Sequence, residues 1–117
     1  MNIISNTILY SAIPDCFRCK WAPVEFDETA VVTYLMSRSA LEYATLVNIF
    51  SIIKDQDQSF QPRTLFDFGS GLCTGLWAAR EVFGQFSEAF MVDKSIHMND
   101  LARYLTINIL FIKKIFI

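Results

Sequence analysis

Two acidic residues and two glycines stand where a nucleoside-bearing cofactor could bind. Gly69 and Gly71 follow a short apolar segment, and glycines at such a turn let a ligand approach backbone that side chains would block. Asp67 lies two residues before the first glycine, at the end of that segment. Asp93 ends the next apolar segment, where a carboxylate can accept both hydrogen bonds of a ribose diol. With Ser70 between the glycines, these residues form a candidate cofactor site.

The spacing distinguishes between two classes of cofactor. A nicotinamide-dinucleotide fingerprint has glycine at the sixth position of G-x-G-x-x-G, which counted from Gly69 is Thr74. An acidic residue at the position of Asp67 is instead typical of the first motif of class I methyltransferases. We therefore expect S-adenosylmethionine, with a nicotinamide-dinucleotide-binding domain as the alternative. A bare strand-to-helix turn is the alternative without a ligand, and Asp93 at the next strand end argues against it.

One position departs from the methyltransferase motif. The third glycine of the motif should fall at residue 73, which is Cys73 here, and the nearest glycine is Gly75. A small Cys is tolerable only if the backbone at that position is not left-handed. We assign no residue as a catalytic base.

The elements that position this site alternate between strand and helix. Residues 64–68 and 89–92 are short and mainly apolar, as buried parallel strands are. A helix is predicted over Thr74 to Phe83, ended by Gly84, and another from Ser95 to Leu105. This order predicts a parallel α/β sheet with right-handed crossovers, an incomplete Rossmann-like class I methyltransferase fold.

Two leading helices are predicted before the first strand. Asp27 is a good N-cap for a helix that should end near Met36. Ser39 and Glu42 match a capping box, so a second helix should begin there and end near Lys54. We expect the second helix to pack on the sheet through one apolar stripe, which consists of Leu41, Ala44, Val47, Phe50 and Ile53.

Length and composition indicate one small core. The 117 residues are 53% hydrophobic and 19% charged, more apolar than most soluble domains, so some faces should be covered by further chain or by a partner. We expect an irregular lead-in (1–23), a helical segment (24–62), the cofactor-binding half (63–105) and a divergent apolar tail (106–117). The apolar stretch in the tail is shorter than the about 18 residues of a spanning helix, so no membrane association is expected.

Neither the charge nor the cysteine content of the sequence indicates a second functional site. The net charge is −2, from 10 basic and 12 acidic residues, without a basic block that would indicate nucleic-acid binding. Cys16 and Cys19 have the spacing of a zinc or redox pair. Cys73 is the only other cysteine and His97 the only histidine. No metal site is therefore predicted, and a reducing compartment is expected.

The residues around the glycines also resemble a known family. The run from Pro62 to Gly71, the Thr74–Ala79 segment that follows it and Val92-Asp93 are similar to the mitochondrial methyltransferase-like proteins that act in assembly of the small ribosomal subunit. Trp77-Ala78-Ala79 is not required for cofactor binding, so this match is more specific than a glycine motif alone. Further matching residues precede the strand: Trp21, Glu25, Phe26, Tyr34, Arg38, Glu42 and Tyr43.

The resemblance implies a mitochondrial matrix protein that binds S-adenosylmethionine and the small-subunit ribosomal RNA during assembly, in support of translation. It leaves methyl transfer open, and a catalytically active RNA methyltransferase is the alternative. It also implies an iron–sulfur cluster, held by cysteines of a carboxyl-terminal half that has no counterpart in this chain. We therefore expect a fragment that is not active alone.

Overall fold

The computed structural model describes residues 24–108 and 113–116. The predicted lead-in, residues 1–23, lies outside the described residues, together with Cys16 and Cys19.

In the described part of the chain, three parallel strands form a sheet: β1 (Thr64–Phe68), β2 (Glu88–Val92) and β3 (Lys113–Phe116). Their order is β1-β2-β3, which is the order of the first half of a doubly wound Rossmann sheet. The first two strands agree with the prediction. The third lies in the segment that was predicted to be a divergent tail, so the sheet has one strand more than the sequence indicated.

A helix follows each of the first two strands, as predicted. Helix α4 (Thr74–Phe83) follows β1 and ends at Gly84, whose φ of 86° favours glycine. Helix α5 (Ile96–Leu105) follows β2, and the Ser95 hydroxyl accepts the N–H of Met98 at 3.2 Å. This hydrogen bond confirms Ser95 as the N-cap of α5.

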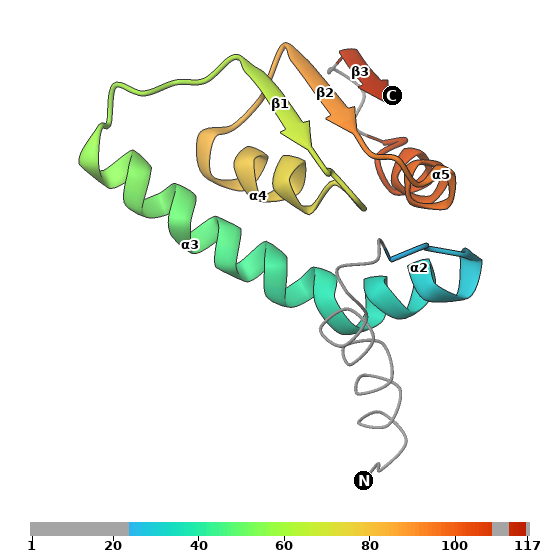
Figure 1. Ribbon diagram of the computed structural model, residues 1–117. Coiled ribbons are helices and arrows are strands. Elements are labelled where there is room, and N and C mark those ends of the chain that lie inside the picture. Colours follow the sequence, from blue (N-terminus) through green and yellow to red (C-terminus); the bar gives the residue numbers. More distant parts are fainter. Residues whose placement is uncertain (1–23, 109–112, 117) are drawn as a thin grey trace, which may run out of the picture.

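One continuous helical arm precedes the sheet (Figure 1). It consists of α2 (Glu28–Tyr34), the π-helical turn η1 (Leu35–Ser39) and α3 (Ala40–Gln56). The Asp27 carboxylate accepts the N–H of Ala30 at 2.8 Å, which confirms the predicted N-cap.

The break predicted inside this arm does not occur. Ser39 has helical dihedrals, φ −60° and ψ −38°, and its side chain caps no N–H group. No glycine or proline lies between Asp27 and Gln56, so nothing forces the chain out of helical geometry, and the π turn accommodates an extra residue. The predicted helix end near Met36 and the predicted capping box at Ser39 are therefore wrong.

Helix α3 packs mainly on α4, which lies between it and the strands (Figure 1). The rings of Phe50 and Phe83 are 5.7 Å apart, and the ammonium of Lys54 donates to the carbonyl of Val82 at 2.5 Å. Leu41 is 67% exposed and Ile53 40% exposed. The predicted stripe is therefore buried only in part, because α4 and not the sheet faces most of α3.

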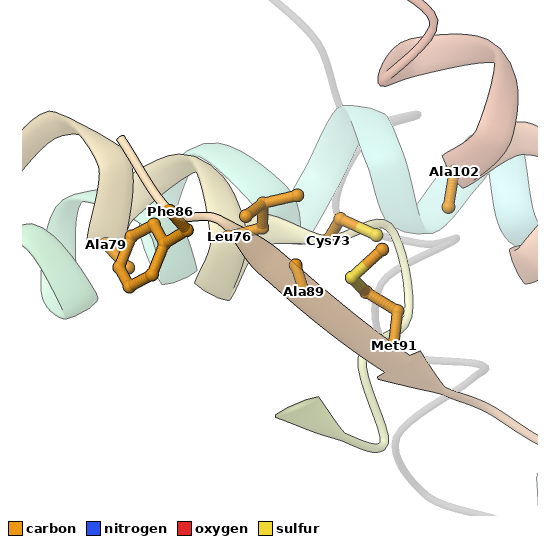
Figure 2. Close-up of a cluster of buried hydrophobic side chains, with 7 residues drawn as sticks. All are labelled: Cys73, Leu76, Ala79, Phe86, Ala89, Met91 and Ala102. Carbon is orange, nitrogen blue, oxygen red and sulfur yellow. The ribbon is translucent and has the colours of Figure 1, made fainter. Parts of the chain in front are cut away.

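The main core lies between α4 and β2. Figure 2 shows Leu76 and Ala79 of α4 beside Ala89 and Met91 of β2, and Phe86 and Ala102 complete this buried cluster with Cys73. The opposite face of the sheet is different: Phe66 and Phe68 are 64% and 82% exposed. The high apolar content of the sequence therefore includes a sheet face that the described residues leave uncovered.

Candidate cofactor site

The turn after β1 is held against the end of β2. Gly69 and Gly71 have φ values of 79° and 49°, in the left-handed region that favours glycine. The N–H groups of Gly69 and Ser70 both donate to the carbonyl of Val92, at 2.7 and 3.1 Å. A Cβ atom on either glycine would meet nothing within 4 Å. Backbone conformation requires these glycines, and the space beside them is open to a ligand.

The carboxylate of Asp93 joins this turn to α5. Its Oδ2 accepts the N–H of Gly71 at 2.9 Å, and its Oδ1 accepts the N–H of Ser95 at 2.8 Å. Two backbone donors thus fix the carboxylate at the carboxyl end of β2. Each oxygen retains a lone pair, so Asp93 can still accept a pair of neighbouring hydroxyl groups.

Asp67 is half-buried and accepts no hydrogen bond from any described residue. Burial raises the pKa of its carboxyl group, and the nearby negative charge of Asp93 raises that pKa further. A carboxylate in these surroundings favours a positively charged ligand group, because such a group would offset both effects.

Ser70 provides a second unsatisfied group. The residue is only 5% exposed, and its hydroxyl oxygen has no hydrogen-bond partner among the described residues. Buried hydroxyl groups without partners are uncommon, and a bound ligand or water is one way to satisfy them.

A cavity of about 760 Å³ lies between this turn and the helical arm. Asp67, Gly69 and Ser70 line it from the sheet side, and Arg38 and Glu42 line it from the arm, among other residues. Gly71 and Asp93 are not among the lining residues and are joined by their hydrogen bond. The predicted site residues are thus brought to one turn, but only three of them face this cavity.

Cys73 occupies the position of the third glycine and has a left-handed φ of 63°. The condition under which a Cys would be tolerable there is therefore not met, and the backbone is strained. Its side chain is fully buried and lies beside Met91 in the core (Figure 2). The presence of Cys instead of Gly at residue 73 consequently does not narrow the cavity.

The sequence profile of one family, described as mitochondrial small ribosomal subunit Rsm22, matches residues 28–116. The chain belongs to the Rsm22 family. This match includes β3 and most of the segment after Leu105, which was set apart as divergent.

A human relative supports the same assignment. The mitochondrial ribosome assembly protein METTL17 of Homo sapiens is 35% identical to this Rsm22-family chain over 86 residues. The aligned region covers 73% of the chain and 19% of METTL17. The resemblance predicted from the glycine motif and its continuation is confirmed, and the chain spans about a fifth of the length of that relative.

A solved structure shows the fold. A putative S-adenosylmethionine-dependent methyltransferase from Methanococcus maripaludis superimposes with a TM-score of 0.57 at 21% sequence identity. The superposition covers 80% of this chain and 43% of the other. The Rsm22-family chain therefore has an incomplete Rossmann-like methyltransferase fold, as predicted.

Sequence reasoning missed one part of the site. The Tyr34 hydroxyl donates to Glu42 Oε1 at 2.5 Å, and burial, followed by this hydrogen bond, raises the pKa of Tyr34. Tyr34, Arg38 and Glu42 were noted for their resemblance to the family, but a helix break was predicted between them. Their spacing of four residues could have indicated one shared helix face.

The described residues do not fit an iron–sulfur cluster. Within residues 24–108 and 113–116, no three His, Cys, Asp or Glu side chains are grouped so that they could hold a metal. Cys73 is the only cysteine in these ranges, and it is buried in the core. No step of the proposed function uses a cluster. None of the described helices has the length and apolar character needed to cross a membrane.

Proposed function

We propose that this chain is the S-adenosylmethionine-binding part of a methyltransferase-like factor for assembly of the small ribosomal subunit in the mitochondrial matrix. The observation that carries the proposal is the connected turn: Gly71 is hydrogen-bonded to Asp93, and the unpartnered carboxylate of Asp67 lies beside the same turn. One ligand that carries a ribose and a positively charged group can be bound only where two carboxylates, such as those of Asp93 and Asp67, lie close to each other.

The residues fit this cofactor in three ways. Asp93 would accept the ribose hydroxyls through its remaining lone pairs. The glycine turn would lie against the methionine moiety, with the buried Ser70 hydroxyl within its reach. Asp67 would face the ammonium group. When bound, S-adenosylmethionine supplies a methyl group on a positively charged sulfur, and no residue of this chain is assigned as a base.

The charges on the site favour S-adenosylmethionine over a dinucleotide. The cavity carries the carboxylates of Asp67 and Glu42 and the guanidinium of Arg38, and Asp93 adds a further negative charge near Asp67. A pyrophosphate would bring further negative charge to this region, whereas S-adenosylmethionine carries a sulfonium and an ammonium. The raised pKa of Asp67 shows that negative charge is already disfavoured there.

The ribosomal part of the proposal is supported by the relatives. The family description names the mitochondrial small ribosomal subunit, and the human relative is named as a mitochondrial ribosome assembly protein. Contact with small-subunit ribosomal RNA and a role in translation are inferred from this kinship.

The test is to deplete the protein from cells that encode it and to measure small-subunit abundance by sedimentation of mitochondrial lysates. We expect small subunits to fall relative to large subunits, and wild-type protein to restore them. Unchanged small-subunit levels after complete depletion would overturn the assembly role.

Rescue with variants then separates cofactor binding from methyl transfer. We expect Asp93→Ala to lose S-adenosylmethionine binding, and the matched change Asp100→Ala, at an exposed carboxylate on α5, to retain it. If Asp93→Ala abolishes an RNA methylation that wild-type protein restores, the active-methyltransferase alternative is favoured instead.

A further inference from the structure

The cavity between the helical arm and β1 contains two opposite charges without partners. Asp67 accepts no hydrogen bond from a described residue, and Arg38 forms no ion pair or hydrogen bond with one. Among the described residues that line the cavity, one other carries a carboxylate, and this residue, Glu42, accepts the Tyr34 hydroxyl. Arg38 is solvent-exposed and Asp67 is half-buried, so both charges on this cavity are free to bind a ligand that carries the two complementary charges.

We infer that Arg38 binds the α-carboxylate of the amino-acid moiety of the ligand, while the ammonium of that moiety faces Asp67. This inference rests on the proposed function, because it assigns the methionine end of S-adenosylmethionine to the two charged walls of the cavity. Arg38 is thereby a specificity-determining residue that distinguishes complete S-adenosylmethionine from fragments without the carboxylate.

The position of Arg38 in the helical arm supports this role. It lies in the π-helical turn η1, and short π turns occur frequently at functional sites. Val31, on α2 just before η1, packs with Leu72 of the glycine turn and Met98 of α5 in a buried cluster. The arm is therefore fixed against the glycine turn, and Arg38 stays over the cavity.

The surrounding charges favour an amino-acid zwitterion over a phosphate group. A guanidinium can bind either anion, but a phosphodiester of RNA would leave Asp67 without a positive partner. An α-amino acid satisfies Arg38 and Asp67 together and adds no net charge.

The experiment measures equilibrium binding of three probes by titration calorimetry. S-adenosylmethionine carries both the carboxylate and the ammonium. Decarboxylated S-adenosylmethionine retains the ammonium alone, and methylthioadenosine carries neither. The proteins are wild type, Arg38→Gln and Arg63→Gln. Arg63 precedes β1 and is not among the residues that line the cavity, so its variant is the matched control for loss of a guanidinium.

We expect Arg38→Gln to weaken S-adenosylmethionine binding about tenfold, as loss of one charge-assisted contact at an exposed residue predicts. Binding of the decarboxylated probe and of methylthioadenosine should not change. Arg63→Gln should bind all three probes like wild type. Far-UV circular dichroism of each variant checks that the fold is retained.

Three results would overturn the inference. Arg38→Gln could bind S-adenosylmethionine as wild type does, which would leave the proposed function intact. It could weaken all three probes equally, which would show a structural role. In a parallel titration with small-subunit ribosomal RNA, it could lose RNA binding while retaining S-adenosylmethionine binding, which would assign Arg38 to phosphate. If folded wild-type protein binds none of the probes, the proposed function itself is wrong, and the inference about Arg38 is wrong with it.

Discussion

The carboxylate of Asp67 lies directly over the first turn of α4, where residue 75 has no side chain. A Cβ atom placed on Gly75 would lie 2.6 Å from Asp67 Oδ2, which is closer than van der Waals contact. Gly75 therefore determines where the Asp67 carboxylate can lie. This link between strand end and helix start was not evident from the glycine pattern, in which Gly75 was only the nearest substitute for a missing third glycine.

Gly75→Ala should weaken S-adenosylmethionine binding without unfolding the protein. The methyl group would displace the Asp67 carboxylate, whereas alanine in a helix is more favourable than glycine by about 1 kcal/mol. We expect at least tenfold weaker binding with a melting temperature close to that of wild type. Calorimetric titration and thermal unfolding measure the two effects. Unchanged affinity would show that the position of Asp67 does not matter for the ligand.

Asp67→Asn should stabilise the ligand-free protein at pH 7. The folded-state pKa of Asp67 is raised above its ordinary value of 3.8 by burial and by Asp93. The folded chain therefore holds this proton over a pH range in which the unfolded chain has lost it, and stability falls as the pH rises through that range. Asparagine does not ionise and therefore avoids this loss of stability. The stability gained over wild type should disappear as the pH falls below the ordinary pKa of Asp67.

Asp57→Asn is the control, because its stability should depend on pH in the opposite sense. A hydrogen bond from the Ser59 side chain lowers the pKa of Asp57, and the Ser59 backbone N–H lowers it further. Its contribution to stability is present above the ordinary pKa and is lost as the pH falls through the folded value. Thermal unfolding is measured between pH 3 and 7 in steps of about one pH unit. As the pH rises, the melting temperature of Asp67→Asn should rise relative to wild type, and that of Asp57→Asn should fall relative to wild type. Parallel curves would contradict the assignment for Asp67.

Cys73→Val should destabilise the protein more than Cys73→Ala. Both remove the buried thiol, at a cost of about 1 kcal/mol, but a β-branched side chain is strongly disfavoured at a left-handed φ of 63°. We expect a further loss of about 1–2 kcal/mol for valine. Urea unfolding of the two variants gives the difference. Equal stabilities would show that the backbone at residue 73 relaxes.

Lys54→Met should weaken the contact between α3 and α4. The Lys54 ammonium donates to the Val82 carbonyl in the last turn of α4, where a positive charge also favours the helix dipole. Methionine retains most of the apolar stem and loses the hydrogen bond, so a loss of about 1–2 kcal/mol is expected in urea unfolding. Lys94→Met, at an exposed lysine, should change stability by much less.

The sheet and the glycine turn could be predicted from the sequence because local signals determine them. Apolar strands that end in acidic residues, Gly84 after α4 and the Ser95 cap are each encoded within a few residues. The first two strands and both connecting helices followed from these signals. The fold class then followed from the alternation of strand and helix, whereas the strand order was not predicted.

The arrangement of the helical arm could not be predicted in the same way. Ser39 and Glu42 satisfy a local capping rule, but the burial of Ser39 at 8% exposure and the pairing of Glu42 with Tyr34 depend on the continuous helix. Strand β3 was hidden for a related reason. Its pairing with β2 is a long-range contact, which no local pattern in the tail indicates.

Equilibrium titration of the wild-type protein with S-adenosylmethionine and with a nicotinamide dinucleotide, under identical conditions, tests the central claim most directly. The connected turn of Gly71 and Asp93 beside Asp67 predicts saturable binding of S-adenosylmethionine and weaker binding of the dinucleotide. Asp93→Asn should reduce the affinity for S-adenosylmethionine at least tenfold, because it weakens acceptance of the ribose hydroxyls. Tighter binding of the dinucleotide, or no binding of S-adenosylmethionine by folded protein, would contradict the account.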